Sequence, residues 1–313
     1  MRFTIAVLCL VLANAASAQE RTVALTFDDL PLVLEASPGI STVAERLAET
    51  RRVNKAILKA LKKHHAWATA FVNEKKVQAD GNAEEGRAIL NEWIKSGYDL
   101  GNHTFSHADL NDISVQEFER EVVDGEASVK PLMNNAGRPL RYLRFPFNHS
   151  GATEGKHAEV ADFLKQRGYE VATCTVENED WVFAHAYKVM LERKDTDAAK
   201  RLRTAYIQFT AQELAYFGQL HQQIFGHELP QVMVLHANRL NADVIEQVLR
   251  VFEKARYRFV TLEQAQSDPA YLTLEKYPTV YGPMWGYRWA RTLGVKVDGS
   301  REPNVPGWIE NYN

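Results

Sequence analysis

The chain has little cysteine and no long hydrophobic segment. It contains only two cysteines in 313 residues, and Cys9 lies in a stretch that has the features of an export signal. Without that stretch Cys174 is alone, and no internal disulfide can form. The fold must therefore be stabilised by a hydrophobic core, which a chain of this length can form in one large domain.

Residues 1–18 are typical of a secretory signal peptide. Arg2 is followed by a short apolar run and then by Ala16-Ser17-Ala18, a small-residue cleavage pattern. The apolar run is too short to span a bilayer. We expect cleavage near Ala18 and a periplasmic or extracellular protein. The alternative is that this stretch is a buried N-terminal helix.

Neither sign of charge is in excess. The 37 basic and 40 acidic residues give a net charge of −3 at pH 7. Such a chain has no electrostatic attraction to nucleic acid or to anionic lipid. We therefore expect no nucleic-acid partner and no membrane insertion, and the charge balance favours a neutral substrate. Nothing in the composition indicates an oligomeric state.

Seven short apolar segments alternate with helix-period stretches. The apolar segments are residues 22–27, 66–72, 98–101, 142–145, 169–176, 232–235 and 257–262. The helical stretches are residues 43–63, 83–96, 115–134, 154–167 and 242–255. This alternation predicts parallel βαβ units, and about seven strands favour an α/β fold that closes, or nearly closes, into a distorted (β/α) barrel. The competing fold is an open, doubly wound sheet.

We assign the barrel to residues 19–268. Two segments do not follow the strand and helix alternation, one inside the barrel and one after it. Residues 183–230 have a helical pattern and are expected to form an insertion that borders the cleft or serves as a purely structural cover. Residues 269–313 form an aromatic-rich tail. We expect this tail to pack on the barrel, because aromatic side chains are more often buried anchors than exposed platforms for sugars.

Five short polar strings follow the predicted strands. They are Thr26-Phe27-Asp28-Asp29, His103-Thr104-Phe105-Ser106-His107, Arg144-Phe145-Pro146-Phe147, Asp180-Trp181 and His236. An α/β barrel has its active site at the carboxyl ends of its strands. The strings supply carboxylates, imidazoles and a guanidinium, which together can form a metal site with its own base and acid.

The adjacent acids Asp28 and Asp29 can serve one site only if the chain leaves the strand there, because neighbouring strand residues point to opposite faces. Leu30-Pro31 predicts such an exit. Two adjacent carboxylates repel each other unless a cation intervenes. One carboxylate can then bind a divalent metal ion while the other acts as a general base. In isolation, the pair also fits a solvated turn.

His103 and His107 are four residues apart, a spacing that predicts two imidazoles on one face of a helical turn. Thr104 takes the place of the glutamate found in the HExxH motif, so a general base must come from elsewhere. The histidine pair alone indicates little. Together with two aspartates at another strand end, it favours a metal site.

Arg144 and His236 follow two further strands. A guanidinium in a barrel mouth needs a carboxylate partner, and Asp28 is the natural candidate. Asp180 can orient His236 and raise its pKa. A strand-end histidine can also be purely structural.

In this order, the five strings resemble the motifs of the polysaccharide deacetylases, carbohydrate esterase family 4. The family motifs are TFDD, H-S/T-x-x-H, an arginine followed by a proline and an aromatic residue, D-x-x-D-W, and an apolar strand that ends in histidine. All five occur between Thr26 and His236. The resemblance implies a distorted barrel, an acetylated carbohydrate substrate and a divalent metal ion, most commonly zinc. Cobalt and nickel also suit a carboxylate with two imidazoles.

The resemblance also implies a role for each matched residue. Asp28 would be the catalytic base, and Arg144 would hold it in place. The metal ligands would be Asp29, His103 and His107.

Five other residues would act on the substrate or on the acid. Asp180 would tune His236, the catalytic acid. Phe147 would lend its backbone N–H to an oxyanion hole. Trp181 and Val234 would line the pocket for the acetyl methyl group.

Three positions depart from the family pattern. Glu177 replaces the first aspartate of the fourth motif, which leaves the role of that carboxylate open. Phe147 replaces the commoner tyrosine and should not affect a function carried by the backbone. Val234 replaces leucine and predicts a slightly wider methyl pocket.

The sequence therefore predicts a metal-dependent hydrolase that removes acetyl groups from a carbohydrate, from nitrogen rather than oxygen, in an amino-sugar polymer or oligomer. Two alternatives stay open. One is a hydrolase that cleaves a non-sugar amide or an O-acetyl ester with the same site. The other is a catalytically silent glycan-binding protein.

Overall fold

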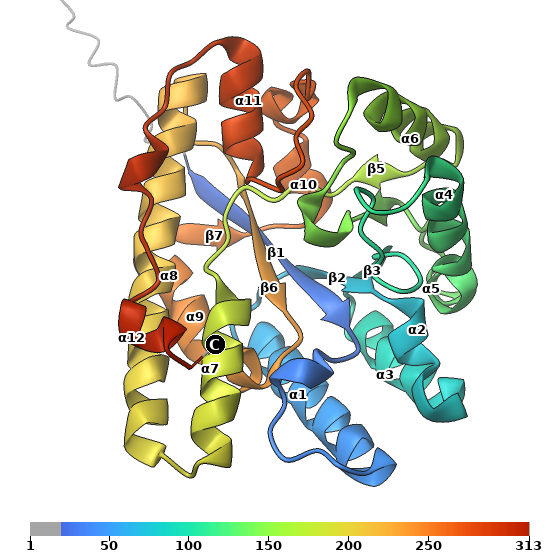
Figure 1. Ribbon diagram of the computed structural model, residues 1–313, viewed down its shortest axis with the longest axis vertical. Helices are drawn as coiled ribbons and strands as arrows, with labels where there is room; N and C mark the ends of the chain where they lie inside the picture. The colour runs from blue at the N-terminus through green and yellow to red at the C-terminus, as the bar shows by residue number, and fades with distance from the viewer. Residues whose placement is uncertain (1–19, 313) are drawn as a thin grey trace, which may run out of the picture.

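In the computed structural model of the chain, residues 20–312 are described, and the predicted signal peptide lies outside them. Seven parallel strands form one sheet that curls into a half-barrel, with helices on its outside (Figure 1). The strands are β1 (Arg21–Leu30), β2 (Ala68–Val72), β3 (Asp99–Asn102), β4 (Tyr142–Leu143), β5 (Glu170–Val171), β6 (Gln231–His236) and β7 (Tyr257–Phe259). The predicted α/β fold, a distorted barrel, is confirmed.

Strand β1 is the centre of the sheet. The strand order is β5-β4-β3-β2-β1-β6, and β7 pairs with the first residues of β1. In the register of β1 with β6, Phe27 faces Leu235 and Asp28 faces His236. Because the strands are parallel, their carboxyl ends lie at one edge of the sheet. The polar strings are thereby brought to a common edge.

The segment after β5 links the two sides of the half-barrel. The sequence predicts one strand over residues 169–176, but only Glu170–Val171 pairs with β4. The chain then crosses to β6, where Val176 bridges Met233. The backbone N–H of Val234 donates to the carbonyl oxygen of Val176 at 3.0 Å.

The longer helices cover the sheet. They are α1 (Val43–Lys63), α3 (Ala83–Lys95), α4 (Val115–Asp124), α5 (Glu126–Asn135), α6 (Glu154–Gln166), α7 (Asp180–Glu192), α8 (Thr196–Phe225), α9 (Arg239–Lys254) and α11 (Trp285–Leu293). Short turns of helix include α2 (Glu74–Val77), η1 (Leu34–Ala36), η2 (Ala79–Gly81), α10 (Leu262–Gln266) and α12 (Gly307–Glu310). Among residues 20–312, no helix combines the length and the apolar character that a membrane crossing needs.

Local capping explains where two of these helices begin. Helix α1 has the predicted bounds, and Thr42 and Glu45 form a capping box at its start. Helix α9 begins at Arg239, earlier than predicted, because the Asn238 side chain accepts a hydrogen bond from the backbone N–H of Asn241.

The single helix predicted over residues 115–134 is instead two helices that meet at Gly125. A Cβ atom at Gly125 would lie 2.6 Å from Oδ1 of Asn102 and 2.9 Å from the carbonyl carbon of Thr104. The backbone therefore passes too close to the end of β3 for any side chain at this position. This contact sets the path of the loop that carries His103.

The helical segment and the aromatic tail both contribute to the core. Phe183 of α7 lies 5.4 Å, between ring centroids, from Phe209 of α8. In the tail, Trp285 and Trp289 are buried. Tyr281 is 75% exposed, so the tail's aromatic residues are not all packing anchors.

Candidate active site

A cavity of about 660 Å³ lies at the carboxyl ends of the strands. Eight of the ten predicted site residues line it: Asp28, Asp29, His103, His107, Phe147, Trp181, Val234 and His236. The other two, Arg144 and Asp180, are buried and contact residues of the cavity wall. The structure thus brings together groups that are up to 208 positions apart in the sequence, from Asp28 to His236.

Asp29, His103 and His107 have one potential ligand atom each, all within 4.8 Å of one another. Oδ1 of Asp29 lies 3.9 Å from Nε2 of His103 and 3.7 Å from Nε2 of His107. This oxygen is buried and accepts no hydrogen bond from the residues that the structure describes, although Nζ of Lys76 lies 3.1 Å away. A carboxylate with two imidazoles fits a divalent metal ion such as zinc, cobalt or nickel.

The protonation states suit metal binding. Nδ1 of His103 lies 2.8 Å from the carbonyl oxygen of Arg144, which can only accept, so this nitrogen donates and leaves Nε2 with its lone pair. Burial lowers the pKa of His103 and of His107 to about 4, so both imidazoles are neutral at pH 7. Burial opposes ionisation of Asp29, but Lys76 and the two imidazoles outweigh it and hold the pKa of this carboxyl well below its usual range.

The prediction that His103 and His107 lie on a helical turn is wrong. They lie in a loop, and Thr104 and His107 have φ angles of 67° and 63°. Side-chain hydrogen bonds replace helical ones. Oδ1 of Asn102 accepts from the backbone N–H of Thr104 at 2.8 Å, and Oγ1 of Thr104 accepts from that of His107 at 3.1 Å. The loop still brings the two imidazole rings to a centroid distance of 4.8 Å.

Asp28 and Asp29 reach the same cavity through an irregularity inside β1. The strand continues to Leu30, beyond the predicted end at Phe27. Its register with β2 shifts between Phe27 and Leu30, and Asp29 has a φ of 68°. A bulge of this kind re-aims side chains, so both carboxylates can face one site while the strand persists.

Left-handed backbone is concentrated at this edge of the sheet. Nine non-glycine residues in the described part of the chain have a positive φ, and six of them lie in or beside the polar strings: Asp29, Thr104, His107, Phe147, Asn148 and Glu179. Such conformations cost about 1–3 kcal/mol each and persist only where the surroundings determine them. Their concentration here fits an active site.

Arg144 is fully buried and fixes Asp28. Its NH1 lies 3.2 Å from Oδ2 of Asp28. Its NH2 donates to Oγ1 of Thr26 and its Nε to the carbonyl oxygen of Ala172, while the guanidinium lies 4.9 Å from the ring centroid of Phe71. Burial raises the pKa of Asp28 even though Arg144 opposes that shift. Oδ1 of Asp28 is buried and has no hydrogen-bond donor among the described residues, so it can accept a proton.

Asp180 holds His236 in its charged form. Nδ1 of His236 lies 2.6 Å from Oδ1 of Asp180, and Oδ2 accepts from the backbone N–H of His236 at 2.7 Å. Asn238 and Asn241 also donate to Oδ2. Burial alone would lower the pKa of His236, but the Asp180 carboxylate outweighs it and raises the pKa to about 10. At neutral pH the imidazole is therefore protonated and can act as an acid.

Two aromatic side chains stand at the mouth of the cavity. Phe147 is 55% exposed and Trp181 is 60% exposed. The Phe147 ring meets that of His107 at a centroid distance of 4.6 Å and an angle of 76°. Val234 is buried in the wall. The cavity thus combines apolar walls with converging polar side chains, as small-molecule sites do.

Sequence reasoning missed or set aside several residues that border the site, among them Lys76, His185 and Glu177. Lys76 lies on α2, four residues after Val72, the last residue of β2; it contacts Asp29 and could have been noticed because it follows a strand end. His185 lines the cavity from α7, one helical turn after Trp181. Glu177 also lines it, and burial together with nearby carboxylates raises its pKa.

The chain is similar to known proteins in sequence and in fold. A family model described as polysaccharide deacetylase matches residues 15–172, just over half of the chain. A peptidoglycan-N-acetylglucosamine deacetylase of Bacillus cereus is 28% identical over 51% of this chain and 46% of its own length. A chitooligosaccharide deacetylase of Azorhizobium caulinodans is 28% identical over 41% of this chain and 55% of its own length. The chain spans about half the length of these curated relatives.

Solved structures of carbohydrate esterase family 4 have a similar fold. A pseudoenzyme from Bacillus anthracis superposes with a TM-score of 0.52 and 15% identity, covering 79% of this chain and 66% of its own. A domain of a multidomain xylanase from the hindgut metagenome of Trinervitermes trinervoides superposes with a TM-score of 0.50 and 16% identity. The match covers 85% of this chain and 97% of that domain. These likenesses concern the fold alone. With the family model and the motif residues in one cavity, they lead to one conclusion: the chain belongs to the polysaccharide deacetylase family, carbohydrate esterase family 4.

Proposed function

We propose that the protein is a metal-dependent hydrolase that removes the N-acetyl group from an amino sugar in a glycan. One observation carries the proposal: a potential metal site, a carboxylate fixed by Arg144 and a histidine fixed by Asp180 share one cavity. Family membership supports a carbohydrate substrate. The names of both curated relatives support deacetylation of an amino sugar.

The residues of the cavity can divide the chemistry between them. A divalent metal ion held by Asp29, His103 and His107 would supply a Lewis acid that polarises the acetyl carbonyl and lowers the pKa of water. Asp28 accepts the proton of the attacking water, because its raised pKa makes it a stronger base than an exposed aspartate. Arg144 keeps that carboxylate in one orientation.

The remaining residues act on the developing charge and on the leaving group. The backbone N–H of Phe147 donates to the carbonyl oxygen as negative charge develops there. His236 gives its proton to the departing amine, which would otherwise leave as an unstable anion. Trp181 and Val234 enclose the acetyl methyl group.

Mass spectrometry of acetylated oligosaccharides tests the proposal. We expect metal-loaded protein to remove acetyl groups from chitooligosaccharides or peptidoglycan fragments, with an equal amount of acetate released. Acetate from acetylated xylan alone would make the protein an O-acetyl esterase. No acetate from any of the three, together with tight binding of a glycan, would favour the catalytically silent alternative.

The Asp180→Asn variant tests the acid. Activity requires protonated His236 and should fall as the pH rises through the pKa of this histidine, near 10. Asparagine keeps the shape of Asp180 but removes the charge that raises the pKa. We therefore expect the alkaline limb of the kcat/KM profile to move down by about two pH units.

A second histidine and aspartate pair provides the control. Nε2 of His227 lies 3.0 Å from Oδ2 of Asp268, and neither residue lines the cavity. Asp268→Asn should leave the alkaline limb in place. If Asp180→Asn also leaves it in place, a group other than His236 donates the proton.

A further inference from the structure

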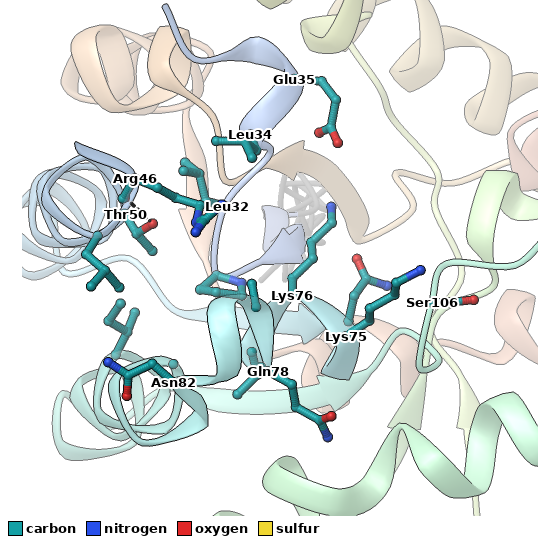
Figure 2. A pocket seen from close by; sticks show the side chains of 17 residues that line it. Leu32, Leu34, Glu35, Arg46, Thr50, Lys75, Lys76, Gln78, Asn82 and Ser106 are labelled. Atoms are coloured by element: carbon teal, nitrogen blue, oxygen red, sulfur yellow. Dashed lines mark hydrogen bonds between the residues drawn. The ribbon is translucent and has the colours of Figure 1, made fainter. Parts of the chain in front are cut away.

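A second cavity, of about 600 Å³, adjoins the candidate active site (Figure 2). Its walls come from the segment after β1, from α1 and α3, and from the residues that follow β2. Glu35, on η1, lines both cavities. The two cavities are therefore neighbours, with Glu35 at their common border.

The charged side chains of this second cavity are mostly basic. Arg46, Lys75 and Lys76 line it, and the only acidic residue among its described lining residues is Glu35. Figure 2 shows Lys76 extending toward Glu35 and Lys75 toward Ser106. The net charge of the chain, −3, favours a neutral substrate, but the local charge here has the opposite sign. A cavity lined by one sign of charge attracts ligands of the other.

Lys76 connects the second cavity with the candidate metal site. Its ammonium group lies 3.1 Å from Oδ1 of Asp29, the atom that faces both histidines. A divalent cation held by Asp29 would repel this ammonium group and compete for its carboxylate partner. Lys76 is partly buried, so it would then need another anion. Lys75 forms no ion pair within residues 20–312 and can share that anion.

A buried acceptor adds a second requirement. Asn73 lines the cavity and is fully buried. Its Nδ2 donates to the carbonyl oxygen of His103 at 2.6 Å, whereas its Oδ1 has no donor among the described residues. A buried acceptor without a partner is costly, and a sugar hydroxyl would satisfy it. The cavity thus offers two cations to an anionic group and an acceptor to a hydroxyl group.

We propose that this cavity binds an acidic sugar unit, with its carboxylate between Lys75 and Lys76 and a hydroxyl group on Asn73, next to the sugar that is deacetylated. The inference rests on the proposed function, because it assigns the neighbouring unit of the same substrate. It narrows the substrate class to glycans in which the acetylated amino sugar alternates with a carboxylated one.

The test compares matched substrates that differ only in charge. In one oligosaccharide N-acetylglucosamine is joined to glucuronate, and in the other it is joined to a sugar with a lactyl ether. Each is compared with its carboxyl-reduced counterpart. We expect kcat/KM to be about tenfold higher for at least one carboxylated form. The preference should shrink at high salt because ions screen charges at a partly exposed site.

Lysine variants assign the preference to this cavity. Lys75→Met should reduce it to about twofold or less, while Lys165→Met, on α6 and outside the cavity, should keep it. Calorimetry on metal-loaded Asp28→Asn protein should likewise show tighter binding of the carboxylated oligosaccharide than of its carboxyl-reduced counterpart. Acetate release with no preference for either carboxylated form would overturn the inference and leave the deacetylase proposal intact. Absence of acetate from every substrate would overturn the deacetylase proposal. In that case the binding measurement still tests the inference, and equal affinity for the carboxylated and the carboxyl-reduced oligosaccharides would overturn it.

Discussion

Asp28→Asn is expected to lower kcat/KM for deacetylation by about a thousandfold while the protein still binds its metal ion. The asparagine side chain has nearly the same shape but cannot accept the proton of the attacking water. Loss of a general base costs between about a hundredfold and ten-thousandfold. The buried position of Asp28 and its contact with Arg144 place this case in the upper part of that range.

Metal content and kinetics must be measured on the same sample. Asp162→Asn, at an exposed position on α6, should be indistinguishable from the unmodified protein in both. Activity near the normal level in Asp28→Asn would remove Asp28 from the role of base. Loss of bound metal together with activity would instead make this carboxylate part of the metal site.

Removal of the metal with a chelator is expected to abolish deacetylation, and added zinc, cobalt or nickel should restore it. Among residues 20–312, Asp29, His103 and His107 are the group of three such side chains whose potential ligand atoms lie close enough together to share one ion. Without the Lewis acid, the acetyl amide is too weak an electrophile for water at neutral pH. Acetate release before and after chelation, and after metal addition, measures the effect.

His107→Ala shows whether the ion binds where the geometry indicates. Restoring this variant should require at least about ten times more metal than restoring the unmodified protein, because one of three protein ligands is gone. His227→Ala removes a histidine outside the cavity and should need no additional metal. Equal metal requirements for His107→Ala and the unmodified protein would place the ion elsewhere.

The parts of the fold that the sequence predicts well are those set by local patterns. Helix α1 has the expected bounds because its apolar spacing and its cap at Thr42 lie within one segment. The gathering of the polar strings was also predictable, since parallel strands bring their carboxyl ends to one edge. The family motifs then predict ten site residues, eight of which line the cavity.

The parts that the sequence misses depend on contacts between distant segments. The loop from His103 to His107 is shaped by Asn102, whose Nδ2 lies 2.9 Å from both the Val122 carbonyl oxygen and the Tyr169 hydroxyl. No local pattern encodes these partners, and a spacing of four residues fits a helix as well as this loop. The same holds for Lys76, which meets Asp29 only in the folded chain.

The left-handed residues around the cavity have a consequence for how this protein can change. At Thr104 and Phe147 a glycine would adopt the left-handed backbone with less strain. Each such replacement would loosen the loop that presents His107 or the turn that offers the Phe147 amide. Substitutions that raise the thermal stability without loosening these loops are therefore expected on helices such as α6 and α8, whose residues do not line the cavity.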